Sequence, residues 1–484
     1  MQNLKHRAIK SVFWVTLANI TSRLIYIGSV AYLARQVSKA DFGVFSIVTT
    51  IITISITIVS FGFDWWYVKS RSHEAKHYNA FVKIGIISVI LLAILQLLGA
   101  NYIGYIFHDN AIAIYLKYLS VFFIIGGSSQ LLYQYLAKHL EFGKAAQATV
   151  VRQIIQALVS IAIAFYIPSA TALIIGFIAG GIVEFIILFI FGKKAFISSI
   201  KQFNKTNIFQ IFRKDYKQTL GILGSQVINV TARLLPPFII GTIINLGAAG
   251  LFTVMDNLIT LPINMIIGAI SSTSLSVFSK ITHKKLAPAS IRLSSLTLAI
   301  TAPFFIYIWL FADFIITIFL GPTWTDGGTI LKLLAIASFI NVAASPISQN
   351  FIVRDKAPML FWWNAIFMVG NVLTLYFGSK QGLLVAVEYY TIFNIFMRLA
   401  LQELTCLILK LPLDTFIKLY IKFIPLWSVI ALIGYLVTRV GVLKYYAVSG
   451  YMIIGLGLYW LLIFIFYPNV SKDVRVIIKT LRKK

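Results

Sequence analysis

The stretch 171–191 reads TALIIGFIAGGIVEFIILFIF and holds one charged residue, Glu184, in 21 positions. About 20 consecutive apolar residues are needed for a helix to cross the hydrocarbon core of a bilayer. The run is too long, and shows too little alternation of polar and apolar residues, to be a strand of a membrane barrel. In lipid a helix is then the remaining way to satisfy the backbone hydrogen bonds. The stretch therefore predicts a transmembrane helix.

Thirteen further runs share this pattern. They lie at residues 11–33, 42–63, 81–100, 113–135, 147–167, 219–243, 248–273, 291–312, 329–351, 358–377, 383–408, 418–437 and 446–467. Only 12% of the chain is charged, against about 25% in soluble domains. The first run is longer than the apolar part of a signal peptide, and many spans follow it. We therefore predict an all-α polytopic membrane protein with about 14 transmembrane helices.

Basic residues are distributed unevenly between the two sides of these spans. Of the 42 lysines and arginines, 29 lie on the side of the two termini and only five on the other side. Those five are Arg35, Lys39, Lys380, Arg439 and Lys444. Cytoplasmic loops carry the excess of Lys and Arg in membrane proteins, so we expect both termini in the cytoplasm. The net charge of +27 then reflects topology and contact with membrane lipids, and no nucleic-acid partner is expected.

Two pairs of matching segments indicate an internal duplication. Residues 19–23 read NITSR and residues 229–233 read NVTAR, at an offset of 210. Lys117 and Lys332 each follow a leucine and precede a glutamine by 17 residues, at an offset of 215. Six spans separate the copies, which gives them the same orientation. Parallel repeats of this kind occur in alternating-access transporters, where the substrate binds between the halves.

A third match, FGVF at 42–45 with AGLF at 249–252, supports the same duplication. It predicts two parallel six-helix lobes followed by two extra C-terminal helices. The expected parts are an N-terminal lobe at 1–191, an amphipathic cytoplasmic linker at 192–217, a C-terminal lobe at 218–408, and the two extra helices with a basic tail at 409–484.

Arg23 and Arg233 lie near the middle of their spans. An arginine at the bilayer centre costs ~2.5–3.5 kcal/mol on insertion scales and so should face protein or water. The guanidinium group binds phosphate oxygens in a bidentate manner, so one arginine from each lobe would suit a cationic cavity for an anion. The alternative is that each arginine locks helices within its own lobe. We add Asn19 and Asn229, which open the repeated pentapeptide, to the candidate binding residues.

Other polar residues within the spans have two interpretations each. Lys117 and Lys332 either extend the cationic path or reach toward the outer interface. Four further charges could act as counter-ions or couple transport to an H⁺ or Na⁺ gradient. These four are Asp256, Glu184, Glu388 and Arg398. Pro236 and Pro237 interrupt the helix that follows Arg233 and are candidates for a hinge.

No cofactor is expected. The chain has no phosphate-binding loop of the nucleotide hydrolases, so energy would come from a gradient or from consumption of the substrate on the far side. The pattern His73–His77 fits a zinc hydrolase, but it lies in a short charged loop, and no metal site is expected. A single cysteine, Cys406, excludes a disulfide framework.

The chain resembles the Wzx-type polysaccharide biosynthesis flippases, which belong to the multidrug/oligosaccharidyl-lipid/polysaccharide exporter superfamily. The residues that carry the resemblance are Trp14, Asn19 and Arg23, LAR at 33–35, SKADFGVF at 38–45, GF at 62–63, GSQ at 224–226 with Asn229, and GAAGLF at 247–252. The resemblance implies two lobes in a V and transfer of a polyprenyl-diphosphate-linked oligosaccharide to the outer leaflet. It also implies a location in the bacterial cytoplasmic membrane, with a polysaccharide polymerase and assembly proteins as partners.

Two alternatives remain at this stage. A multidrug or cation antiporter of the same superfamily would have the same architecture, although a cationic cavity disfavours cationic drugs. A membrane polysaccharide polymerase or ligase should need an outer domain or a long outer loop for its chemistry. We expect the outer loops to be short, about a dozen residues at 101–112.

Overall fold

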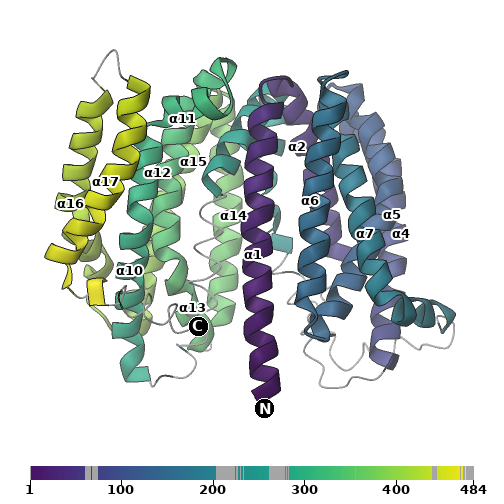
Figure 1. The fold of residues 1–484 in the computed structure, drawn as a ribbon, viewed down its shortest axis with the longest axis horizontal. Helices are drawn as coiled ribbons and strands as arrows, with labels where there is room; N and C mark the ends of the chain where they lie inside the picture. The colour runs from purple at the N-terminus through teal and green to yellow at the C-terminus, as the bar shows by residue number, and fades with distance from the viewer. Residues whose placement is uncertain are drawn as a thin grey trace. The chain divides into compact units, whose positions relative to one another are not determined.

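The computed structural model describes residues 2–59, 75–202, 234–260, 283–354, 356–438 and 444–468. It also describes the short pieces 67, 224, 227–228, 230–232, 278, 281, 470–472 and 475. Within these residues every regular element is a helix (Figure 1). The chain divides into two compact units, Met1–Val254 and Met255–Lys484.

The first unit is a bundle of long helices that run side by side (Figure 1). They are α1 (Gln2–Leu33), α2 (Lys39–Val59), α4 (Ala75–Ile106), α5 (Asn110–Lys138), α6 (Phe142–Ala164) and α7 (Ala170–Lys201). Two shorter apolar helices, Leu234–Ile243 and Leu246–Thr260, follow, and the second runs across the division between the units.

The second unit is also helical. Its elements are α10 (His283–Leu310), α11 (Ala312–Phe319), η2 (Pro322–Gly327), α12 (Gly328–Ala344), η3 (Ser345–Ser348), α13 (Gln349–Val353), α14 (Ala357–Ser379), α15 (Leu383–Leu409), α16 (Thr415–Thr438) and α17 (Lys444–Phe466). The last pair, α16 and α17, packs at the edge of this unit beside α10 (Figure 1).

Helices α6 and α7 are in close contact because α7 has glycines at four-residue spacing. A Cβ on Gly176 would lie 2.7 Å from the carbonyl oxygen of Gln156, and a Cβ on Gly180 would lie 2.7 Å from that of Arg152. Neither position has room for a side chain. Small residues at this spacing allow membrane helices to approach closely and pack by van der Waals contact.

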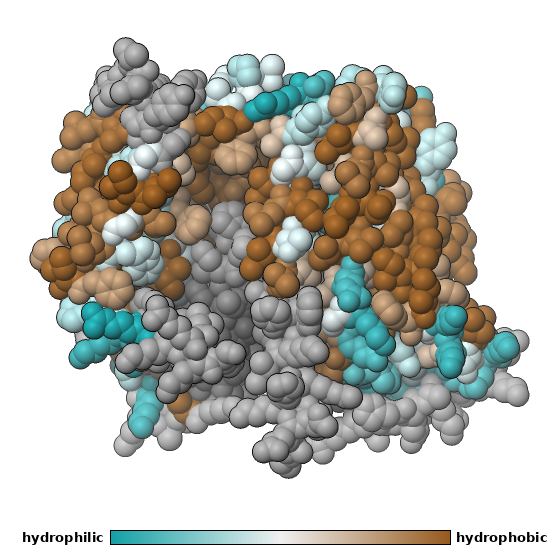
Figure 2. Space-filling view, in the orientation of Figure 1, coloured by the Kyte–Doolittle hydropathy of each residue, from teal (hydrophilic) through white to brown (hydrophobic). Residues whose placement is uncertain are grey.

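The helices fit a membrane. Each of the 14 runs expected from the sequence overlaps helical residues, and ten of the described helices are long and apolar enough to cross a bilayer. Figure 2 shows apolar side chains along the flanks of the helices and hydrophilic ones gathered near the helix ends. The chain is therefore a multi-pass membrane protein, as predicted; the number 14 and the V of two six-helix lobes stay predictions.

Two segments differ from the sequence-based picture. Helix α7 continues to Lys201, so the expected linker begins as part of a transmembrane helix, with Phe196 buried. Its end is held to α4 where Ser199 donates a hydrogen bond to Asn79 (2.7 Å). The segment 313–328, expected to be an outer loop, is longer than the 101–112 loop and contains most of α11 and all of η2. Residues 203–217 of the linker lie outside the described residues.

Candidate functional site

Arg23 lies on α1 in the first unit. Its side chain is half-buried, and its charge acts on the hydroxyl of Tyr26, three residues further along the same helix. A residue three positions on lies on the same face of a helix. The Arg23 guanidinium and the Tyr26 hydroxyl, a group that can also bond an anion, therefore lie on the same face of α1.

The other members of the predicted cationic cavity are only partly visible. Arg233 and Asn229 lie outside the described residues, and of Asn19 only the helical backbone is described. Pro236 and Pro237 are buried in the helix Leu234–Ile243. The meeting of Arg23 with Arg233 and the hinge at the prolines stay predictions.

Lys332 has an acidic partner. Its Nζ lies 2.9 Å from a carboxylate oxygen of Asp313, on α11. Both side chains are partly exposed, 32% and 63%, and such pairs contribute little to stability. The Asp313 carboxylate nevertheless offsets the positive charge of Lys332, which the sequence analysis assigned to a cationic path. Its counterpart Lys117 is half-buried on α5.

The predicted coupling residues fall into separate places. Glu184 on α7 accepts a hydrogen bond from Arg152 on α6, with a nitrogen–oxygen distance of 2.7 Å. The Arg152 guanidinium also lies 5.2 Å from the centre of the Phe177 ring. Glu184 is thus the counter-ion of an arginine, but of Arg152 within the first unit. Glu388 is half-buried on α15, and it forms no ion pair within the described part of the chain.

Asp256 and Arg398 belong to one polar cluster in the second unit. The charges of both side chains act on the hydroxyl of Tyr390, on α15. Arg398 also lies over the Phe367 ring of α14, 4.4 Å from its centre. A cation and an acid thus act electrostatically on one hydroxyl among the helices of this unit, and ionisable residues within membrane helices commonly serve transport.

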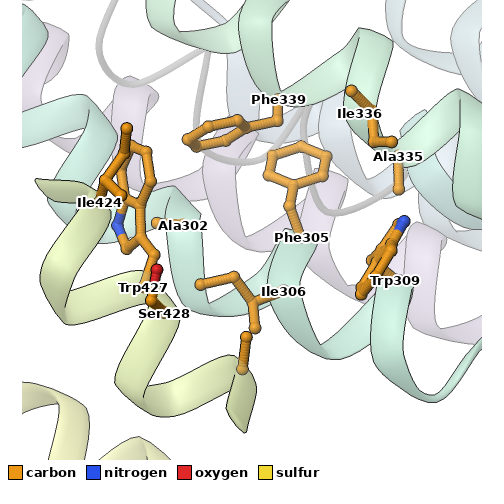
Figure 3. Close-up of a pocket in the computed structure, with 11 residues that line it drawn as sticks. Ala302, Phe305, Ile306, Trp309, Ala335, Ile336, Phe339, Ile424, Trp427 and Ser428 are labelled. Atoms are coloured by element: carbon orange, nitrogen blue, oxygen red, sulfur yellow. The ribbon is translucent and has the colours of Figure 1, made fainter. Parts of the chain in front are cut away.

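An apolar pocket of about 310 Å³ opens between α10, α12 and α16 (Figure 3). Its lining residues are Ala302, Phe305, Ile306, Trp309, Ala335, Ile336, Phe339, Ile424, Trp427, Ser428 and Ala431. Phe305 and Phe339 face one another, with ring centres 5.6 Å apart, and Trp427 packs edge-on against Phe339. The polar groups among the lining side chains are the Ser428 hydroxyl and the indole N–H groups of Trp309 and Trp427. The pocket suits a flexible hydrocarbon chain and no charged group.

The model of one protein family, described as polysaccharide biosynthesis protein, matches residues 32–327, which is more than half of the chain. The chain belongs to this polysaccharide biosynthesis family. The resemblance noted in the sequence is thereby confirmed. The match covers the segments that hold Gly43 and Gly250 and ends at the start of α12.

Relatives of this family member include a transport protein. The succinoglycan biosynthesis transport protein ExoT of Rhizobium meliloti is 20% identical over 380 residues, which are 78% of this chain and 75% of ExoT. The lipid II flippase MurJ, in an inward closed conformation, has a similar fold, with a TM-score of 0.73 and 18% identity over 94% of this chain and 99% of MurJ. A multidrug resistance MATE family transporter of the MOP superfamily has a TM-score of 0.62 and 12% identity over 82% of this chain and 98% of the transporter. The family member thus has the fold of membrane transporters.

Sequence reasoning missed the partners of the charged residues and the apolar pocket in this family member. Gln156 and Gly180 are in close contact between α6 and α7. Arg152 lies four residues before Gln156, and Glu184 lies four residues after Gly180, so each is one helical turn from this contact. This spacing predicts the ion pair only once α6 and α7 are known to be neighbours. Trp309 and Trp427 lie within apolar runs rather than beside charged loops, and this placement was an available sign of the pocket.

Proposed function

We propose that this chain is a flippase that moves a polyprenyl-diphosphate-linked oligosaccharide, the repeat unit of a surface polysaccharide, from the inner to the outer leaflet by alternating access. The observation that carries the proposal is the match of a polysaccharide biosynthesis family to a chain with the fold of a lipid flippase. The likeness to ExoT, a transport protein of succinoglycan biosynthesis, supports the same class of cargo.

The chemistry of such a cargo suits the residues of the chain. A diphosphate carries negative charge, and arginine is the side chain that binds phosphate oxygens in pairs. Arg23 supplies one guanidinium inside a span, and Arg233 would supply the second from the other repeat. The polyprenyl chain would remain in an apolar environment, and the pocket between α10, α12 and α16 offers one surface for it.

Transport would draw on an ion gradient or on removal of the flipped product. Asp256 with Arg398, whose charges both act on Tyr390, is the candidate coupling group of the second unit, and Glu184 is paired with Arg152 in the first unit. A polymerase that extends the glycan on the outer face, with its assembly proteins, would consume the product. We place the chain in the bacterial cytoplasmic membrane with both termini inside.

The proposal is tested by replacing the two arginines of the expected cavity and measuring flipping. Arg233→Ala and Arg23→Ala should each abolish flipping, because the phosphate loses a bidentate partner, while the protein still inserts into the membrane. Mass analysis of polyprenyl-linked intermediates in a deletion strain carrying each variant should show accumulation of the same glycan as the deletion alone.

The control is Lys380→Ala, which removes a cation from an outer loop and should complement fully. Wild-type translocation by Arg233→Ala would contradict the proposal, as would the absence of any accumulated lipid-linked glycan in the deletion strain.

The fold shared with MATE transporters keeps a drug antiporter as a second candidate. If the chain is a drug antiporter, its overexpression should give drug resistance, whereas overexpression of a flippase should not. A polymerase is disfavoured, because the described outer segments hold only the short α11 and η2 and no domain for glycosyl transfer.

A further inference from the structure

Helix α2 and the start of the helix Leu246–Thr260 cross with direct backbone contact within the first unit. A Cβ added to Gly43, near the start of α2, would overlap the carbonyl oxygen of Leu246 and lie 2.7 Å from its carbonyl carbon. A Cβ added to Gly250, near the start of the helix Leu246–Thr260, would overlap the carbonyl oxygen of Lys39 and lie 2.7 Å from the Gly43 nitrogen. Real Cβ atoms essentially never approach within 3.0 Å of other atoms, so both positions admit only glycine.

The crossing is reciprocal. Gly43 contacts Leu246 and Gly250 contacts Lys39, and each residue is separated from its counterpart by 207 positions. The helix starts are capped in the same way at the same spacing. The Ser38 hydroxyl accepts a hydrogen bond from the Asp41 nitrogen (3.1 Å), and the Asn245 amide oxygen accepts one from the Ala248 nitrogen (2.8 Å). The two copies of the repeat thus meet each other at equivalent positions.

Such a contact can open and re-form at little cost. Cα–H contacts to carbonyl oxygens are worth about 0.5–1 kcal/mol each. The capped nitrogens of Asp41 and Ala248 bond to side chains of their own helix starts, so they keep these partners when the helices part. The atoms nearest to each glycine at the crossing are backbone atoms.

An apolar layer lies one turn further into the helices. Ile47 is fully buried, and a Cβ on Gly241 would lie 3.0 Å from its Cδ1 atom and 3.0 Å from the Phe107 ring. The Phe107 ring packs edge-on against Phe238, with ring centres 4.8 Å apart. The crossing and this layer together bury the start of α2, where Phe42, Val44 and Ile47 are at most 5% exposed. Under the expected topology this is the outer end of the spans.

We propose that the crossing of Gly43 and Gly250 is the outer gate of the transport path: the two helix starts touch while the outer end is closed and part when the head group of the lipid-linked cargo leaves. The proposal rests on the proposed function, in which the cargo exits on the outer side. It assigns to the repeated FGVF and AGLF segments a role in gating, distinct from the charged residues that would bind the cargo.

The test measures access of an impermeant thiol reagent from outside. The reporter is Thr50→Cys, a buried position on α2 beyond Ile47, in a protein whose buried Cys406 is replaced by alanine. Gly43→Ala and Gly250→Ala should each keep the helices apart and speed labelling about tenfold, a shift of about 1.4 kcal/mol toward the open state. Because the contact is reciprocal, the two variants should act alike, and the double variant should add little.

The matched control is Gly99→Ala on α4, where an added Cβ meets nothing within 4 Å and labelling should stay at the starting rate. If the glycine variants fail to fold, Ile47→Ala thins the apolar layer without touching the crossing and should also speed labelling. Folded glycine or Ile47 variants that label at the control rate would overturn the gate.

Transport is followed separately so that the two proposals can fail independently. Loss of glycan translocation with unchanged labelling would refute the gate and leave the flippase standing. Faster labelling in a protein whose unmodified form moves no lipid-linked glycan would refute the flippase and leave the gate standing.

Discussion

Among single residues, Tyr459 has the most specific packing role. Pro303 lies inside α10 and has no N–H, so the carbonyl of Ala299, four residues earlier, loses its helical donor. The Tyr459 hydroxyl of α17 donates to this carbonyl oxygen at 2.8 Å. An extra C-terminal helix thus satisfies a backbone group that a proline in the neighbouring helix leaves free.

Replacement of this hydroxyl gives the first prediction. Tyr459→Phe should lower the free energy of unfolding by about 1–3 kcal/mol, because a buried carbonyl is left without a donor. Thermal unfolding in detergent measures the loss. In a Pro303→Ala background residue 303 regains its N–H, and the same replacement should then cost much less.

Tyr451→Phe is the control for the tyrosine ring. The Tyr451 hydroxyl donates to the carbonyl of Ile430 on α16, but residue 434 there is a glycine with its own N–H. The Gly434 backbone also bonds to this hydroxyl, so its loss leaves the Ile430 carbonyl and the Gly434 N–H one helical turn apart, where they can bond to each other. Equal destabilisation by Tyr451→Phe and Tyr459→Phe would contradict the role given to Pro303.

At the scale of elements, α6 and α7 form a ladder in steps of four residues. Gly176 faces Ser160 and Gln156, Gly180 faces Arg152, and Glu184 pairs with Arg152 one turn further along α7. The ion pair therefore continues a contact that glycine packing has already fixed. This geometry favours a helix-locking role for Glu184 over a role in coupling.

The second prediction separates the two roles of Glu184. Glu184→Ala leaves the Arg152 charge without its partner and should reduce folded protein, since breaking a buried pair is more costly than replacing both members. The double variant Arg152→Met and Glu184→Leu should restore the yield and keep transport. Loss of transport in a well-folded double variant would instead make Glu184 a coupling group. Fluorescence-detected size-exclusion and the intermediate assay provide the two readouts.

The elements show what the sequence could and could not predict. The ten described helices that are long and apolar enough to cross a bilayer were predictable, because a helix in lipid needs a long apolar run whatever it packs against. The duplicated segments at 42–45 and 249–252 were predictable by comparison of the chain with itself, and they meet at the glycine crossing. Hydropathy does not distinguish an apolar side chain that faces lipid from one that lines a pocket, so Phe305 and Phe339 were not singled out.

The ion-pair partners of the charged residues within the spans also could not be predicted from the sequence. An arginine in a span needs a partner, but the partner of Arg152 is 32 residues away on another helix, and the chain offers several acids at comparable depth. For Lys332 the partner lies on α11, in an outer segment expected to be a short loop. The choice among acids depends on helix packing, which apolar runs alone do not encode.

At the scale of the whole molecule, the two extra helices are an integral part of the second unit. Helices α16 and α17 share an apolar core with α10, in which Tyr307, Phe423 and Tyr459 are buried. Helix α16 also supplies four residues of the apolar pocket. The structure of the MurJ flippase covers 94% of the chain, and that of the MATE transporter covers 82%. The chain therefore shares more of its fold with the lipid flippase than with the drug transporter.

Orientation in the membrane is the last prediction, and it applies to the whole chain at once. The bias of 29 basic residues against five should hold the termini in the cytoplasm. The two ends of α15 then lie on opposite sides, with Gln381 outside and Lys410 inside, and both are exposed. In a protein with Cys406 replaced by alanine, Gln381→Cys should react with an impermeant maleimide in spheroplasts, and Lys410→Cys only after lysis. The pair Tyr166→Cys and Lys201→Cys, beyond α6 and at the end of α7, repeats the test in the first unit. The reverse labelling pattern would invert the direction of the proposed transport and place the glycine crossing at the cytoplasmic end. The reason is that consecutive loops are joined by one membrane-spanning helix, so the side of one loop determines the side of the others.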